Sequence, residues 1–375
     1  MTKKNVIIIM MDGGRLDYAQ NSPTFNNLKS KSIFFSHSIT YGPHTIAAMH
    51  AVFSGSYGSR TGTNSYWSTF KFKKEIFKTL TEYLKENNFH THADVINQLV
   101  VPKQGFDNYV VHDELNDDLF QRHKLLLEQM HQHNLENKNF FLYLHYSKIH
   151  TGIMNEVLKV YDNFSKDFFS NKEKNELRYS KLFKNSEKYL DKILEKIYQL
   201  NLDKNSIILV MSDHGISIGE KIGERAYGAF CYDYTLRTFT YFLIPGMKSM
   251  EITQQIRTVD FLPTILELLN IPKDENYNSF DGVSLLPLME EKSIPENYAF
   301  SETGNPLNDK APPKEPNVKS IRTSTWKLIL NEHDNSKELY NLKLDPNENN
   351  NLIGTEEKME EILWIELQNL IKKHD

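Results

Sequence analysis

The sequence predicts an α/β protein: a large, mostly parallel sheet with helices on both faces, followed by a small α+β subdomain. Two observations favour this class. Short apolar runs such as Val6 to Met11 and Ile207 to Met211 are bounded by polar residues, as in fully buried parallel strands. These runs alternate along the chain with segments of helical periodicity, and that alternation is typical of a parallel sheet covered by helices.

The individual elements follow from their periodicity and their breakers. Apolar residues spaced three and four apart predict helices over residues 75–88, 182–200 and 259–269. Continuous apolar runs predict further strands over 140–146 and 239–244, the latter stopped by a Pro-Gly pair.

The C-terminal part does not continue the alternation of buried strands and helices. Residues 303–317 hold a glycine and four prolines, which indicates a loop. Beyond it we expect short antiparallel strands at 320–330 and 338–342 and a closing helix from about Thr355. The predicted division is therefore a catalytic domain over 1–300 and a C-terminal subdomain over 301–375.

Composition excludes several function classes. The 375 residues carry a net charge of −5, which gives no support for a nucleic-acid surface. A single cysteine, Cys231, excludes an internal disulfide framework and a cysteine-based zinc cluster. The opening apolar run is too short for a signal peptide, and no run reaches the ~20 apolar residues of a membrane helix. We expect a soluble, cytoplasmic protein with no nucleic-acid or membrane partner; its oligomeric state is left open.

Polar side chains follow two of the predicted strands. Asp12 comes directly after the first apolar run, and Asp213 and His214 follow the run that ends at Met211. In open α/β sheets, sites lie beyond the carboxyl ends of the strands. The alternative to a functional site is a purely structural role, in which one aspartate lies in a turn and the other caps a helix. Two strands that each deliver a carboxylate to one edge instead indicate a metal site.

Several segments, taken in order, resemble the sulfatase-like branch of the alkaline phosphatase superfamily over nearly the whole chain. They include Asp12-Gly13-Gly14-Arg15, Ser212-Asp213-His214-Gly215, Val259-Asp260-Phe261-Leu262-Pro263-Thr264, Asp281-Gly282-Val283-Ser284 and Glu338-Leu339-Tyr340-Asn341-Leu342. The resemblance implies an alkaline phosphatase-like fold and a metal-dependent enzyme.

The resemblance places Thr45 at the nucleophile position, about ten residues before the Ser54-Gly55 pair. Sulfatases carry a cysteine or serine there, within Cys/Ser-x-Pro-x-Arg, and convert it to formylglycine. This chain has Ala47 and Met49 at the proline and arginine positions. Threonine cannot become formylglycine, so we expect a phosphoester (mono- or diester) or phosphonate hydrolase or phosphotransferase instead. Thr45 would be its nucleophile, acting through a covalent intermediate. The competing interpretation of Thr45 is a helix N-cap.

A threonine hydroxyl is a weak nucleophile at neutral pH unless metal coordination or a base lowers its pKa. The resemblance implies one divalent cation held by Asp12, Thr45, Asp213 and His214. Two carboxylates, one imidazole and one hydroxyl suit Mn²⁺ or Zn²⁺, with Ca²⁺ and Mg²⁺ as the other candidates.

The remaining predictions concern the substrate. His150, after the strand at 140–146, is expected to protonate the leaving group. Arg225 or Tyr227 is expected to contact the substrate, and Asn64 to meet its anion. Residues 151–181, charged and aromatic, are the predicted specificity insert. The expected substrate is a small soluble phosphorylated compound or a glycan phosphate.

Other polar residues near these motifs are expected to support the fold rather than contact the substrate. We interpret His44 and His145 as structural residues, because an adjacent or strand-buried histidine usually is. Arg15 and Asp17 are interpreted as an ion pair or helix cap.

Two alternatives to the phosphoester prediction stay open. One is a sulfate ester hydrolase that uses threonine directly. The other is a non-catalytic metal-binding protein whose site survives for structure. Activity on sulfate and phosphate esters, measured beside metal content, separates all three.

Overall fold

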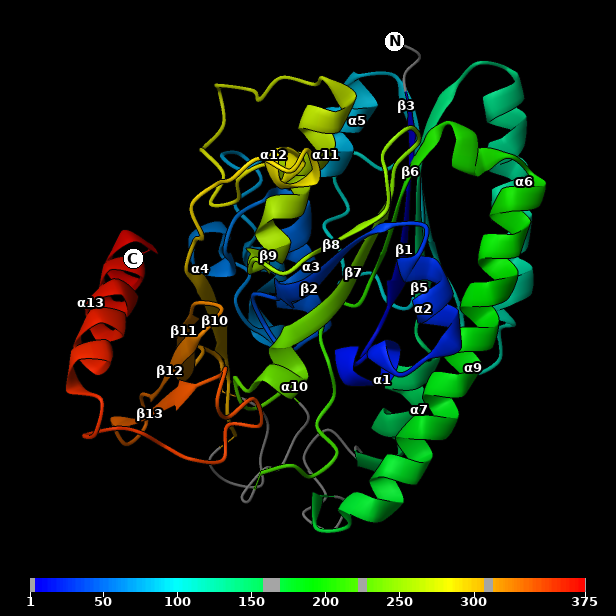
Figure 1. The fold of residues 1–375 in the computed structure, drawn as a ribbon. Coiled ribbons are helices and arrows are strands. Elements are labelled where there is room, and N and C mark those ends of the chain that lie inside the picture. Colours follow the sequence, from blue (N-terminus) through cyan, green and yellow to red (C-terminus); the bar gives the residue numbers. More distant parts are fainter. Residues whose placement is uncertain (1–3, 158–168, 222–227, 307–312, 375) are drawn as a thin grey trace.

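The computed structural model describes residues 4–157, 169–221, 228–306 and 313–374 (Figure 1). Within these ranges, a nine-stranded sheet has the order β4-β3-β5-β1-β6-β7-β2-β8, with β9 pairing to β2. Its strands are β1 (Asn5–Met11), β2 (Ile33–Ile39), β3 (Phe89–Val95), β4 (Asn108–Val111), β5 (Asn139–Tyr146), β6 (Ser206–Met211), β7 (Arg237–Leu243), β8 (Met250–Ile252) and β9 (Ile256–Arg257).

The sheet is mostly parallel, which confirms the predicted fold class. Strands β4, β3, β5, β1 and β6 all run the same way. Strand β7 is antiparallel to both of its neighbours, β6 and β2. The apolar run at 239–244 could not reveal this reversal, because a strand buried on both faces reads the same in either direction.

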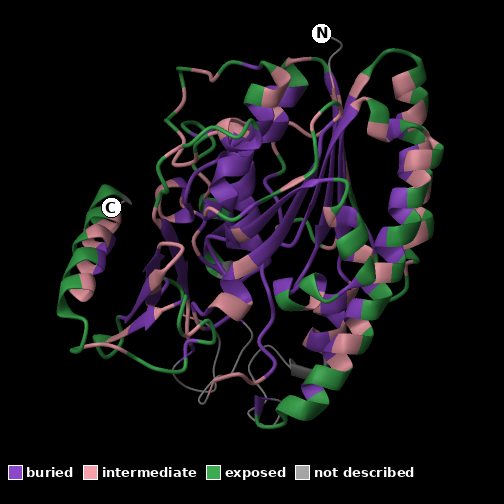
Figure 2. Cartoon of the chain, viewed as in Figure 1, coloured by how far each residue is buried: buried purple, intermediate pink, exposed green. Residues whose placement is uncertain are grey.

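Helices cover both faces because side chains alternate across each strand. Ile7 and Ile9 of β1 pack on the side of α1 (Leu16–Gln20), α2 (Pro23–Lys29), α6 (Leu119–Leu135) and α9 (Lys172–Gln199). Val6 and Ile8 pack on the side of α3 (Thr45–Ser54), α5 (Leu80–Glu86), α11 (Phe261–Leu269) and α12 (Leu286–Met289). Figure 2 shows the result: the central strands are mostly buried, and exposed residues lie on the outer sides of helices such as α6 and α9 and in the loops.

Two predicted helices begin elsewhere than their periodicity indicated. Helix α5 begins at Leu80, since the Thr79 hydroxyl accepts from the backbone N–H of Glu82 and the Glu82 carboxylate accepts from that of Thr79. Helix α9 begins at Lys172, ten residues before the predicted start, where Asn171 caps it. Part of the predicted insert at 151–181 therefore belongs to this helix, part to α7 (Lys148–Val157), and residues 158–168 lie outside the described residues.

The smaller sheet is antiparallel and contains β10 (Ala299–Thr303), β11 (Val318–Arg322), β12 (Trp326–Asn331) and β13 (Ser336–Asn341). The predicted strand at 320–330 is a hairpin, because the polar turn after Arg322 closes through a Thr323 N–H bond to the Trp326 carbonyl. Helix α13 (Glu357–His374) packs on this sheet through Leu363 and Leu367. The same apolar cluster includes Ala47 and Ala51 of α3, so the small sheet joins the main core.

The short helices complete the described elements: α4 (Gly58–Thr61), α10 (Asp233–Leu236), and the 3₁₀ turns η1 (Tyr66–Lys71), η2 (Leu202–Lys204) and η3 (Thr258–Asp260). No helix in the described ranges combines the length and apolarity that crossing a membrane requires.

Candidate active site

Two carboxylates meet at the carboxyl ends of β1 and β6. These strands are parallel neighbours, with Met10 opposite Met211, so Asp12 and Asp213 emerge at the same edge. Both side chains are buried. Asp213 Oδ1 accepts from the backbone N–H of Gly13 at 3.2 Å and from that of His214 at 2.9 Å. Gly13 has a φ of +74°, a conformation that favours glycine and lets its backbone turn toward this carboxylate.

Thr45 is the first residue of α3 and points into this site. Its Oγ lies 3.3 Å from Asp12 Oδ2 and 3.4 Å from Nε2 of His214. The helix N-cap is His44, whose Nδ1 accepts from the backbone N–H of Ala47. The N-cap interpretation of Thr45 is therefore wrong, and its hydroxyl belongs to the site instead.

The residues around Thr45 fit a divalent cation. Asp12, Asp213 and His214 each offer a ligand atom, and these atoms lie within 4.8 Å of one another. Asp213 Oδ2 is buried and accepts no hydrogen bond from the described residues, while the buried Asp12 Oδ1 has only imidazole nitrogens beside it, the nearer at 3.3 Å. His214 Nδ1 lies 2.7 Å from the Gly215 carbonyl and donates to it, which leaves the Nε2 lone pair facing the carboxylates. Unpartnered buried carboxylate oxygens are costly without a cation or proton.

Two histidines complete the surroundings of Asp12. His150, on α7, places Nδ1 3.3 Å from Asp12 Oδ1. His145, on β5, places Nε2 3.0 Å from Asp12 Oδ2. Burial alone would raise the pKa of Asp12, but these two imidazoles hold it well below its usual range. Conversely, burial would lower the pKa of His150, and Asp12 raises it above its usual value.

His145 is the site residue that sequence reasoning missed. It pairs with Met10 across β5 and β1, one residue from the end of its strand. Its role depends on β5 lying beside β1, and that strand order is a long-range property that no local pattern in the sequence encodes. Sequence position alone could only mark it as a buried strand histidine.

The other predicted substrate residues stay predictions. The Asn64 side chain lies against Ser68 and Glu315. Arg225 and Tyr227 lie outside the described residues. Arg15 pairs with Asp17 at 2.8 Å and also with Glu220, in agreement with the ion-pair interpretation.

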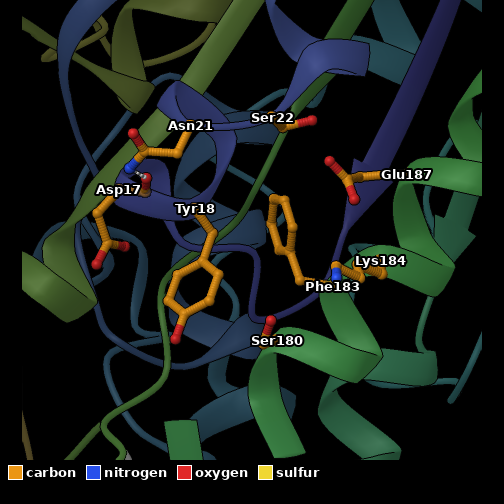
Figure 3. Close-up of a pocket in the computed structure, with 8 residues that line it drawn as sticks. All are labelled: Asp17, Tyr18, Asn21, Ser22, Ser180, Phe183, Lys184 and Glu187. Carbon is orange, nitrogen blue, oxygen red and sulfur yellow. Dashed lines mark hydrogen bonds between the residues drawn. The ribbon is translucent and has the colours of Figure 1, made fainter. Parts of the chain in front are cut away.

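A surface pocket lies apart from this site, between the α1–α2 segment and α9 (Figure 3). Its described lining includes Tyr18, Phe183 and Lys184 and none of the four proposed metal-binding residues. Because it lacks the clustered carboxylates and imidazoles, the pocket is not the centre of the chemistry.

Comparisons with known proteins agree with this fold. The sulfatase family model matches residues 4–271, and a model of the C-terminal part of N-sulphoglucosamine sulphohydrolase matches residues 227–374. The chain belongs to the sulfatase family, within the alkaline phosphatase superfamily.

Named relatives are about a quarter identical to this chain within the aligned stretch. A Delta 4,5-hexuronate-2-O-sulfatase of Bacteroides thetaiotaomicron is 28% identical over 44% of this chain and 34% of its own length. Human arylsulfatase K is 27% identical over 49% of this chain and 35% of its own length. The chain thus matches about a third of the length of these curated relatives. The solved structure of a 2-O GAG sulfatase shares the fold, with a TM-score of 0.80 at 18% identity, covering 99% of this chain and 92% of that one.

These relatives overturn the predicted phosphoester chemistry. The curated relatives above are sulfatases, so the findings favour sulfuric ester hydrolysis, and the prediction of a phosphodiesterase or phosphotransferase is wrong. That prediction depended on the loss of the formylglycine precursor at Thr45. A hydroxyl beside a cation, however, can attack a tetrahedral sulfur or a tetrahedral phosphorus with the same ligands, so threonine alone does not select phosphorus.

Proposed function

We propose that this protein hydrolyses sulfate esters with Thr45 itself as the nucleophile, and that 2-O-sulfated uronic acid residues of saccharides are the substrate class to test first. The observation that carries the proposal is the position of the Thr45 hydroxyl, 3.3 Å from Asp12 and 3.4 Å from His214, in a member of the sulfatase family. The substrate class comes from the names of the relatives.

The first step transfers the sulfuryl group to the enzyme. Thr45 Oγ bonds to sulfur, the bond from sulfur to the ester oxygen breaks, and the alcohol leaves with a proton from His150. The hydroxyl proton of Thr45 passes to Asp12 Oδ2, the carboxylate oxygen 3.3 Å away.

The second step restores the enzyme. Water gives a proton to His150 and attacks sulfur, the bond from sulfur to Thr45 Oγ breaks, and that oxygen takes its proton back from Asp12. Sulfate is released. Because both half-reactions use the same residues in opposite directions, one acid and one base suffice.

Asp12, Thr45, Asp213 and His214 would hold a divalent cation, which would lower the pKa of the Thr45 hydroxyl and neutralise charge on the sulfuryl oxygens. The N-terminus of α3, ten residues long, adds backbone N–H groups that favour an anion beside Thr45. With one imidazole among the ligands, the set suits Mn²⁺ or Zn²⁺ better than Ca²⁺; elemental analysis of the purified protein identifies the ion.

The experiment is a substrate panel. We expect p-nitrophenyl sulfate and an unsaturated hexuronate 2-O-sulfate disaccharide to be hydrolysed with a higher kcat/KM than p-nitrophenyl phosphate and bis(p-nitrophenyl) phosphate. Faster hydrolysis of either phosphate ester would contradict the proposal. A bound cation without turnover of any ester would instead identify a non-catalytic metal-binding protein.

A further inference from the structure

A second group of side chains that could bind a metal lies near the carboxyl ends of β3 and β4. Asp94 is on β3, His112 directly follows β4, and His123 is on α6. One ligand atom from each lies within 4.8 Å of the others, and the three side chains are at most 3% exposed. None of these residues takes part in the chemistry proposed for Thr45.

The facing atoms are two imidazole nitrogens and one carboxylate oxygen. Asp94 Oδ1 lies 2.5 Å from Nδ1 of His112 and 3.6 Å from Nε2 of His123. Within the described residues, this buried Nε2 has no hydrogen-bond partner. A buried nitrogen left without a hydrogen bond carries an energetic cost that a bound ion removes.

The far side of each group is held by its own partner. His123 Nδ1 contacts the Tyr189 hydroxyl at 2.5 Å, and His112 Nε2 contacts Ser147 Oγ at 3.2 Å. Arg122 donates to Asp94 Oδ2 at 2.6 Å. Such outer contacts fix the tautomer and orientation of metal ligands. The remaining atoms, His112 Nδ1, His123 Nε2 and Asp94 Oδ1, lie within 4.8 Å of one another.

We propose that Asp94, His112 and His123 form a buried Zn²⁺ site, separate from the site at Asp12. Two nitrogens and one oxygen suit zinc and leave a fourth position for water, whereas Ca²⁺ and Mg²⁺ require more oxygen ligands. Zinc ligands lie about 2.0–2.2 Å from the ion, so the contact between Asp94 Oδ1 and His112 Nδ1 widens by roughly 1 Å on binding.

Arg122 lies beside the site and pairs with Asp94 at 2.6 Å and with Asp117 at 3.3 Å. The site also adjoins the residues around Asp12, because the His112 ring lies edge-on to the His145 ring with centroids 6.1 Å apart. An ion here would fix the end of β5, which carries His145 and is directly followed by Ser147.

The test is metal stoichiometry of the full chain after equilibration with Zn²⁺ and removal of free ion. We expect two zinc ions per wild-type chain, one in His123→Gln and one in Asp213→Asn, and none in the double variant. His133→Gln is the matched control: this histidine is on the same helix and stacks on His90, so it should keep both ions.

A milder variant keeps the proposal testable if His123→Gln does not fold. Tyr189→Phe removes only the hydroxyl that holds His123, and we expect roughly 10–100-fold weaker binding of one of the two ions in a chelator competition. A folded His123→Gln that binds as many zinc ions as the wild type would overturn the proposal and leave the cluster as a metal-free Arg122–Asp94–His112 ion network. Since the readout is bound metal, failure of sulfate ester hydrolysis does not affect it.

Discussion

At the level of single residues, the proposed hydrolysis of sulfate esters depends on one hydroxyl, that of Thr45, placed between a carboxylate and an imidazole. Thr45→Ala removes that oxygen and keeps Asp12, Asp213 and His214. Loss of a catalytic nucleophile typically costs several orders of magnitude in rate, so we expect kcat for sulfate esters to fall by roughly 10³-fold or more. Thr45→Ser should retain part of the activity. Steady-state kinetics with parallel metal analysis checks this, and turnover by Thr45→Ala near the wild-type rate would assign the attack to water.

The carboxylate at 213 is expected to hold the cation at this site. Asp213→Asn removes one negative charge from the ligand set, so we predict that metal content and activity fall together. The control is Asp191→Asn, which alters an exposed aspartate of α9 that contacts Thr24. Full metal occupancy and full turnover in Asp213→Asn would exclude the carboxylate from the site.

Residues that follow strands were predictable from the sequence, and residues placed by long-range packing were not. Asp12 and Asp213 could be found because each lies within two residues of the end of a buried apolar run, and parallel strands bring such ends together. His145 and the group around Asp94 required the order β4-β3-β5-β1, which local periodicity does not encode.

At the level of elements, the sequence predicted the continuously apolar strands β1, β5, β6 and β7 but missed the buried strands β2 and β3, and it placed the helix starts poorly. The apolar stripe at 75–88 continues through Ile76 and Phe77, but the capping box at Thr79 begins α5 five residues later than the stripe. Strand β10 was not predicted. It has only five residues and is followed by a proline-rich loop, so its pattern is too short to identify.

Strand β10 also carries a buried acid that should affect stability. Burial raises the pKa of Glu302 to about 7, against 4.5 for an ordinary glutamate, and its carboxyl contacts the Tyr41 hydroxyl. The folded state therefore binds the proton more tightly, and the stability of the wild type falls as pH rises from 4.5 to 7.

Glu302→Gln should lack this part of the pH dependence. We expect the variant to gain up to about 3 kcal/mol relative to wild type between pH 4.5 and 7, with no further gain above that window. Urea denaturation of both proteins across this range is the measurement. Parallel pH profiles would show that Glu302 titrates normally.

At the level of the whole molecule, a buried ion network joins α10 to the small sheet. Asp233 of α10 contacts Arg322 and Lys327 of the small sheet, and Lys327 also contacts Glu348 at 2.8 Å. Removing one partner from such a network leaves a buried charge uncompensated, which typically costs about 3–5 kcal/mol.

Lys327→Met is therefore predicted to lower the free energy of unfolding by about that amount. Lys292→Met, which removes an exposed partner of Glu290, should change it by less than about 1 kcal/mol. Guanidinium denaturation compares the two. Equal small effects would mean that the network adds little to the attachment of the small sheet.

The most direct test of the central claim is mass spectrometry of wild-type enzyme quenched during turnover of an aryl sulfate. A good leaving group makes the first step fast, so the sulfated enzyme should accumulate. If Thr45 is the nucleophile, the peptide containing Thr45 gains the mass of one SO₃ group, and the same peptide from Thr45→Ala does not. Continued hydrolysis with an unmodified Thr45 peptide would contradict this role of Thr45.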